Sequence, residues 1–251
     1  MEAGIARRVE HVMGMPISLA LRGTHLHDDA AEEAWQAALA ELRWVDAVFS
    51  TWRADSQVSR LGRGELTLEE CDPAVAEVMR LGDDARVSSG GAFDVWRRDP
   101  DGVRRLDPSG VVKGWAVDRA VVPLLGLSGT DVCLSAGGDM VCHVADPDGE
   151  PWTVGVEDPL DPTRLVARIP LRRGAVATSG SAHRGGHVVD ARTGGAATAL
   201  ASVTVVGASL TSVDIDATTA LALGPDGPAW LRSRLRTGVV VWADGRAETV
   251  G

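Results

Sequence analysis

The segment DVCLSAGGDMVCHVAD, residues 131–146, opens a run of short segments with the character of β-strands. PWTVGVEDP (151–159), LVARIPLRRGAVATSG (165–180), HVVDARTGG (187–195) and ASVTVVGAS (201–209) follow it, separated by turn residues. Short apolar segments bounded by Gly, Pro and Asp favour strands. The middle of the chain is therefore predicted to be a β-meander.

Helices are predicted on both sides of this meander. Residues 28–50 begin with an acidic first turn and then carry apolar side chains on one face of the predicted helix. Residues 71–87 begin with Asp72 as the candidate N-cap and Pro73 at the first helical position. The remaining expected elements are a strand over 15–23, a short helix from about Trp115 interrupted by Pro123, helices over 212–224 and 228–237, and a closing strand over 238–244. This order predicts an α+β fold with mixed or antiparallel sheets flanked by helices.

Composition limits the class of protein. The chain has 251 residues, 45% of them apolar, and a formal net charge of −10, which argues against a broad nucleic-acid or anionic-membrane surface. Its three cysteines show no CxxC spacing, so a disulfide framework is not expected. No repeat or linker divides the chain, and no apolar run is long enough to cross a bilayer. We expect a single domain over residues 1–251 in the cytoplasm.

Lys113 is the only lysine, since the other basic residues are all Arg. An ammonium group is a compact point charge that the planar guanidinium group does not replace at a close-packed anion site. Lys113 is therefore a candidate anion-binding residue, although a solvated surface lysine is the alternative.

Asp214 and Thr218 lie four residues apart in a predicted helix, so both side chains project from one face. A carboxylate and a hydroxyl suit a Mg²⁺ ion that keeps several waters and also binds a phosphate. The alternative is a helix-capping aspartate followed by an ordinary helical threonine.

Two further segments carry weaker signals. Gly137 and Gly138 precede Asp139 directly after an apolar strand, where a ligand could approach the backbone closely, but a plain turn has the same composition. Residues 178–194 contain two histidines, and a histidine is a reasonable general base near neutral pH. A polar hairpin explains that segment equally well.

The order of these segments resembles that of the ApbE family of FAD:protein FMN transferases over nearly the whole chain. The matching segments are MGMPISLAL (13–21), FSTWRADSQVSRL (49–61), GGAFDV (90–95), SGVVKGWAVDRA (109–120), SAGGDM (135–140), ATSGS (177–181), HVVDARTG (187–194) and DIDATTALALG (214–224). The resemblance implies an ApbE-like α+β fold with a T-fold-like core. It also implies Mg²⁺-dependent transfer of FMN from FAD to a Thr or Ser hydroxyl of an acceptor protein, with release of AMP.

The resemblance also implies roles for individual residues. Asp214, Thr218 and the main-chain carbonyl of Val112 would be metal ligands, and His187 would be the base for the incoming hydroxyl. Asp118 would read the adenine. The other residues expected at the FAD site are Met13, Trp52, Asp94, Lys113, Gly137, Gly138, Asp139 and Ser179.

This chain departs from the family pattern at several places, one of which is Ala191 in place of a Pro. Trp52 stands where the family usually has Tyr, and Val112 where it usually has Ala. The segment SGSAHRGGH (179–187) is short and lacks the family's Asp and Tyr, which leaves the surface for the acceptor protein open. Hydrolysis of FAD to FMN and AMP, and FAD binding without turnover, are therefore the alternative functions.

Overall fold

The computed structural model describes residues 4–98, 102–180 and 188–251, and an eight-stranded sheet forms the centre of this part of the chain. Each pair of neighbouring strands in the sheet is antiparallel. Its strands, in spatial order, are β1 (Ile5–Val12), β2 (Met15–Gly23), β5 (Thr130–Ala136), β6 (Asp139–His143), β9 (Arg173–Gly180), β12 (Leu200–Gly207), β13 (Thr237–Trp242) and β14 (Ala247–Val250). The α+β prediction is confirmed, and the main sheet is antiparallel.

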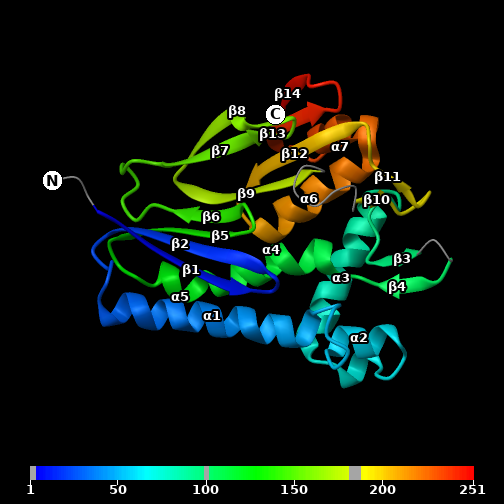
Figure 1. Ribbon diagram of the computed structural model, residues 1–251, viewed down its shortest axis with the longest axis horizontal. Helices are drawn as coiled ribbons and strands as arrows, with labels where there is room; N and C mark the ends of the chain where they lie inside the picture. Colours follow the sequence, from blue (N-terminus) through cyan, green and yellow to red (C-terminus); the bar gives the residue numbers. More distant parts are fainter. Residues whose placement is uncertain (1–3, 99–101, 181–187) are drawn as a thin grey trace.

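Three two-stranded sheets accompany the main sheet. They pair β3 (Trp96–Arg98) with β4 (Arg104–Leu106), β7 (Trp152–Asp158) with β8 (Asp161–Leu171), and β10 (Val189–Asp190) with β11 (Gly195–Ala196). The β7–β8 hairpin packs on the main sheet, where Val154 and Leu171 contact Cys142 and Val176 in a small apolar cluster. Figure 1 shows this hairpin above the sheet and β3–β4 projecting at the other end of the molecule.

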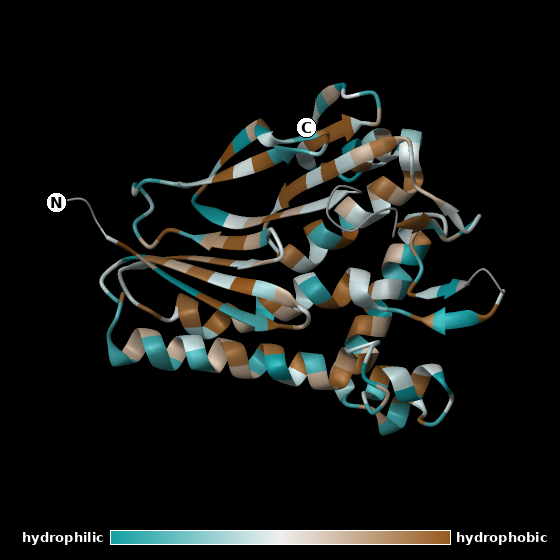
Figure 2. Cartoon of the chain, in the orientation of Figure 1, coloured by the Kyte–Doolittle hydropathy of each residue, from teal (hydrophilic) through white to brown (hydrophobic). Residues whose placement is uncertain are grey.

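Helices cover the sheet below β1, β2 and β5 and beside β9 and β12 (Figure 1). They are α1 (Asp29–Phe49), α2 (Gln57–Gly62), α3 (Pro73–Ser88), α4 (Ser109–Ala120), α5 (Val122–Leu125), α6 (Leu210–Leu223) and α7 (Gly227–Ser233), with short 3₁₀ turns at Leu68–Glu70 and Gly224–Asp226. Apolar and polar residues alternate along strands such as β2 (Figure 2), whose apolar side chains Ile17, Leu19 and Leu21 are buried in the core. Burial of one face of the sheet against the helices builds the core.

The early helices begin at capping residues, of which Asp72 was predicted from the sequence. The backbone N–H of Ala31 donates to Asp28 at 3.0 Å at the start of α1, and that of Ala74 donates to Asp72 at 2.9 Å at the start of α3. Pro73 occupies the first turn of α3. These starts follow from local sequence because an N-cap side chain satisfies N–H groups that the helix leaves free.

The predicted start of the third helix is wrong. The helix α4 begins at Ser109, whose N–H donates to Asp107 at 3.1 Å, and so it includes Gly110 and Gly114. Glycine disfavours helix interiors, but a side chain at Gly114 would place its Cβ 2.7 Å from the carbonyl oxygen of Leu210. Tight packing of α4 on α6 therefore requires glycine here, and tertiary contacts outweigh the low helix propensity. Pro123 lies at the start of α5, just after the chain leaves α4.

Several regular elements were not expected from the sequence, among them the edge strands β1 and β14, the β3–β4 hairpin and the short helix α2. The strand β1 exposes most of its side chains, so its hydrophobic alternation is weak. The strand over 238–244 is confirmed as β13, but β14 follows it at the edge of the sheet.

Candidate functional site

A cavity of about 960 Å³ lies where turns and helix ends from distant parts of the chain meet. It is lined by the β1–β2 turn, the end of α1, the first turns of α4, the β5–β6 turn, the end of β9 and part of α6. The predicted site residues that line it are Met13, Trp52, Asp94, Val112, Lys113, Gly137, Gly138, Asp139, Ser179, Asp214 and Thr218. The fold thus brings together residues that the sequence scatters over some two hundred positions.

Two tight turns bring backbone to the cavity. Met13 and Gly14 join β1 to β2 with φ values of 57° and 70°, and Gly137 and Gly138 join β5 to β6 with φ values of 58° and 99°. Positive φ is costly for residues other than glycine, so Met13 is held in a conformation that its side chain disfavours. The strands that each turn joins pair in continuous register, β1 with β2 and β5 with β6. The sheet therefore fixes the positions of Met13 and Asp139.

The ammonium group of Lys113 lies between two buried carboxylates. Its Nζ is 3.2 Å from Oδ1 of Asp214 and also forms an ion pair with Asp139. The N–H of Gly114 donates to Oδ2 of Asp214 at 3.1 Å, and the N–H of Thr178 donates to Oδ1 of Asp139 at 2.8 Å. One cation and two carboxylates leave this buried cluster with one net negative charge when all three are ionised.

The electrostatics of the cluster follow from its burial. Burial on its own lowers the pKa of Lys113, but the two carboxylates outweigh it and hold the pKa above its usual value. Burial raises the pKa of Asp214 to about 6, Lys113 opposes that rise, and Asp139 adds to it. Lys113 is therefore a permanent cation in this site, and the excess negative charge favours binding of a second cation.

The oxygen atoms of the site fit a hard divalent cation. Asp214 and Thr218 both face the cavity from α6, and the Thr218 hydroxyl is 2.9 Å from that of Ser179. Asp139 Oδ2 is buried, and the ammonium group of Lys113 is its partner. In the described ranges no group of three His, Cys, Asp or Glu side chains could enclose a metal. Few protein oxygens beside an open cavity suit Mg²⁺ that shares its coordination with waters and phosphate.

Val112 lies in α4, not in a loop. A helical carbonyl usually accepts an N–H four residues later in the chain, but its second lone pair remains available. Val112 lines the cavity beside Lys113, so a carbonyl contribution to a cation is compatible with this placement.

Asp118 has a different place from the one expected. It does not line the cavity. It accepts hydrogen bonds from the N–H and hydroxyl of Thr211 at 2.8 and 2.6 Å, from the N–H of Leu210 at 2.9 Å, and from the Ser209 hydroxyl at 2.7 Å. These bonds tie α4 to the first turn of α6 and give Asp118 a structural role, while its contact with adenine stays a prediction.

His187 lies outside the described residues, so the structure does not place the expected base. The chain re-enters the described part at Val188, which lines the cavity together with Val189. Nearby, the guanidinium group of Arg192 donates hydrogen bonds to both carboxylate oxygens of Asp190, and this contact is the largest cause that lowers the pKa of that carboxyl.

Several cavity residues were not expected from the sequence. Arg97, from β3, forms an ion pair with Asp107, and both line the cavity. Thr178 supports Asp139 through its backbone, and Ser202 lies in the neighbouring strand β12. No short motif marks these positions, because their contacts arise from strand pairing and from the β3–β4 hairpin.

Residues 13–98 and 96–241 match the family model described as the ApbE family. The chain belongs to the ApbE family. A curated relative, the FAD:protein FMN transferase of Klebsiella pneumoniae (strain 342), is 26% identical over 259 residues, which cover 79% of this chain and 74% of the relative.

Solved ApbE structures share the fold. The flavinyl transferase ApbE of Pseudomonas stutzeri, in its apo form, has a TM-score of 0.82 at 22% identity, covering 100% of this chain and 96% of its own. The flavin transferase ApbE of Vibrio cholerae has the same TM-score and identity, with coverage of 99% and 98%. The ApbE-like fold expected from the sequence is thereby confirmed.

Within the described ranges, none of the helices combines the length and the apolar character needed to traverse a bilayer.

Proposed function

We propose that this ApbE family chain transfers FMN from FAD to an acceptor protein. The observation that carries the proposal is the buried Lys113–Asp139–Asp214 cluster beside Thr218, on the wall of a cavity of about 960 Å³. The family membership and the name of the Klebsiella relative support the same reaction.

In the proposed reaction, a Thr or Ser hydroxyl of the acceptor attacks the FMN-side phosphorus of FAD. A new P–O bond forms to the acceptor, the P–O bond to the AMP side breaks, and AMP leaves. The proton of the attacking hydroxyl passes to a base, for which His187 is our candidate. FMN then remains attached to the acceptor as a phosphoester.

Asp214, Thr218 and the carbonyl of Val112 would hold Mg²⁺ in this site. When bound, the ion would supply positive charge to the phosphoryl oxygens as negative charge develops on them. Lys113 holds a second positive charge in a fixed position, because Asp139 and Asp214 clamp its ammonium group from two sides. Groups placed in advance around developing charge need no reorganisation during the reaction.

The remaining cavity residues would bind FAD. Met13, Asp94, Ser179 and the Gly137–Gly138 turn all line the cavity, and Trp52 lies there with a largely exposed indole. The proposed partners are FAD and an acceptor protein that carries a Thr or Ser in its flavinylation motif, with no nucleic acid and no insertion into a membrane. The single-domain organisation and the cytoplasmic location remain predictions.

The test is to mix the protein with FAD, Mg²⁺ and a peptide that contains a flavinylation motif, and to analyse the products by mass spectrometry. FMN-peptide together with an equal amount of AMP is the expected result. Free FMN and AMP without labelled peptide would instead assign FAD hydrolysis, and bound but intact FAD would assign a binding protein. A parallel sample with EDTA tests the dependence on a divalent metal.

A further inference from the structure

Trp52 has an unusual place among the large apolar side chains that the structure describes. It is the most exposed of them, with 97% of its surface accessible, and it also lines the cavity. An indole is a large, flat apolar group, and leaving it in water forgoes the stabilisation that burial would provide. A ligand in the cavity would supply the missing contact.

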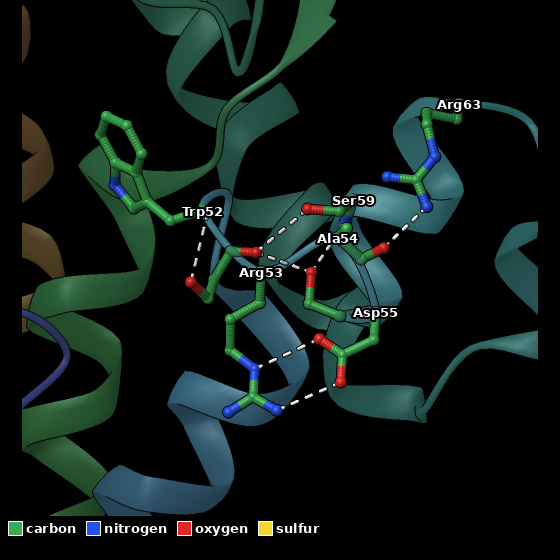
Figure 3. Close-up of polar contacts among 8 residues, drawn as sticks. Trp52, Arg53, Ala54, Asp55, Ser59 and Arg63 are labelled. Atoms are coloured by element: carbon green, nitrogen blue, oxygen red, sulfur yellow. Dashed lines mark hydrogen bonds and ion pairs between the residues drawn. The ribbon is translucent and has the colours of Figure 1, made fainter.

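The backbone that carries Trp52 is held by three serines. Ser50 follows the last residue of α1, and its carbonyl oxygen accepts hydrogen bonds from the hydroxyls of Ser56 at 2.6 Å and Ser59 at 3.1 Å (Figure 3). The Ser50 hydroxyl in turn accepts the N–H of Trp52 at 3.3 Å. We call Ser50, Ser56 and Ser59 the serine brace.

The far end of the segment is also anchored. Ser56 is 1% exposed and caps α2, because its hydroxyl accepts the N–H of Ser59 at 3.0 Å. The N–H of Ser56 donates to the carbonyl of Arg53 at 3.3 Å, and Arg63 donates to the carbonyl of Ala54 at 2.7 Å. In Figure 3 the bond from Arg63 to Ala54 lies on the side of the segment opposite to the indole of Trp52. Hydrogen bonds thus fix the main chain on both sides of Trp52, while the indole itself stays almost fully exposed.

We propose that the serine brace holds Trp52 as a preformed wall of the cavity for a flat ring of FAD, which makes Ser56 and Ser59 positioning residues. The inference rests on the proposed function, since FAD is the ligand. A wall that is rigid before binding lowers the conformational entropy lost when the ring stacks on it. Support of this kind is required of residues that must meet a ligand in one orientation.

A purely structural role for the serines predicts a different outcome. In that case the hydroxyls would only complete the end of α1 and the start of α2, and their loss would lower stability regardless of the side chain at position 52. Positioning through Trp52 requires instead that the effect of a serine on FAD binding disappears when the indole is absent.

The experiment is a double-mutant cycle on the full chain with Ser59→Ala, Trp52→Ala and the double variant. FAD affinity is measured by calorimetry, kcat and KM by AMP release, and stability by thermal melting. Ser59 is chosen because Ser56 also caps α2. Ser59→Thr retains the hydroxyl, and Ser233→Ala removes a comparable hydroxyl bond at the end of α7, from Ser233 to the carbonyl of Trp230 at 2.7 Å.

We expect Ser59→Ala to weaken FAD binding about three- to tenfold, as loss of one hydrogen bond would, and to raise KM with little change in kcat. Ser59→Thr should restore affinity, Ser233→Ala should leave it unchanged, and Ser59→Ala should have no further effect in the Trp52→Ala background. Independent effects of the two substitutions, or loss of stability with normal affinity, would overturn the positioning role. Normal affinity in Trp52→Ala would overturn it as well. Absence of FAD binding in the unaltered protein would refute the proposed function itself.

Discussion

Lys113 and Asp214 belong to two helices that lie far apart in the sequence, and the Nζ of one is 3.2 Å from Oδ1 of the other. The contact exists because α4 packs tightly on α6, with Gly114 against the backbone of Leu210. The side chain of Asp214 is 2% exposed and that of Lys113 is 19% exposed, so the ion pair is largely shielded from solvent and opens only toward the cavity. Its strength depends on both partners remaining charged.

Replacing Asp214 with Asn should strongly slow metal-dependent turnover while preserving the fold. The amide can still accept the N–H of Gly114, but the site loses a carboxylate that a hard cation needs. We expect transfer to slow by about 10²–10³-fold, as happens when one charge-stabilising group is removed. Product formation at several Mg²⁺ concentrations measures this, with the exposed Asp226→Asn as control. Normal rates at low Mg²⁺ would place the metal elsewhere.

Replacing Lys113 with Met should make stability more sensitive to pH. Burial already raises the pKa of Asp214, and loss of the ammonium group removes the contact that opposes this rise. A carboxyl with a raised pKa in the folded state favours folding below that pKa, and this contribution is lost as pH increases through it. The variant should therefore lose roughly 3–5 kcal/mol of stability at pH 8 and less at pH 5. Thermal melting in EDTA at pH 5 and pH 8 measures the loss of stability. An equal loss at both pH values would contradict the expected role of Lys113.

Replacing Asp118 with Ala should lower stability without a selective loss of FAD affinity. The substitution removes four hydrogen bonds that connect α4 with the start of α6, and loss of a helix cap together with its neighbours costs about 1–3 kcal/mol. Melting and FAD titration on the same sample test this, with Asp83→Asn on the surface of α3 as control. Loss of adenine-dependent affinity in a fully stable variant would restore the role expected from the sequence.

Replacing His187 with Ala should slow FMN transfer about 10²–10⁴-fold if this residue takes the proton of the attacking hydroxyl. FAD affinity should change little, since most of the expected FAD contacts, among them Met13, Trp52 and the Gly137–Gly138 turn, come from other segments. Single-turnover AMP release measures the rate beside an FAD titration. Near-normal release would end the assignment and make Asp139 and Asp190 the next residues to test.

The protein should bind FAD at least about tenfold more tightly than FMN, because the pyrophosphate and adenine add contacts that FMN lacks. The cationic Lys113 and the wide cavity motivate this expectation. Calorimetric titration with both flavins in the presence of Mg²⁺ gives the two affinities. Equal values would show that recognition is confined to the flavin end.

Part of this protein can be predicted from local sequence. The starts of α1 and α3 depend on Asp28 and Asp72, whose side chains act within three residues of their own positions. Lys113 stands out because it is the only lysine, and Asp214 and Thr218 because a helix places residues four apart on one face. Family membership follows from the order of such motifs along the chain.

Other features were decided only by the tertiary structure. The helix α4 includes Gly110 and Gly114 because contact with α6 outweighs their low helix propensity, so its start could not be predicted locally. Asp118 accepts N–H groups at the start of α6 because α4 packs on α6, a contact that its local sequence does not predict. The exposed indole of Trp52 depends likewise on where α1 ends and α2 begins. Local sequence determines which groups are present and which helix ends they can cap, whereas contacts between distant segments determine which groups share a buried charge and which face the cavity.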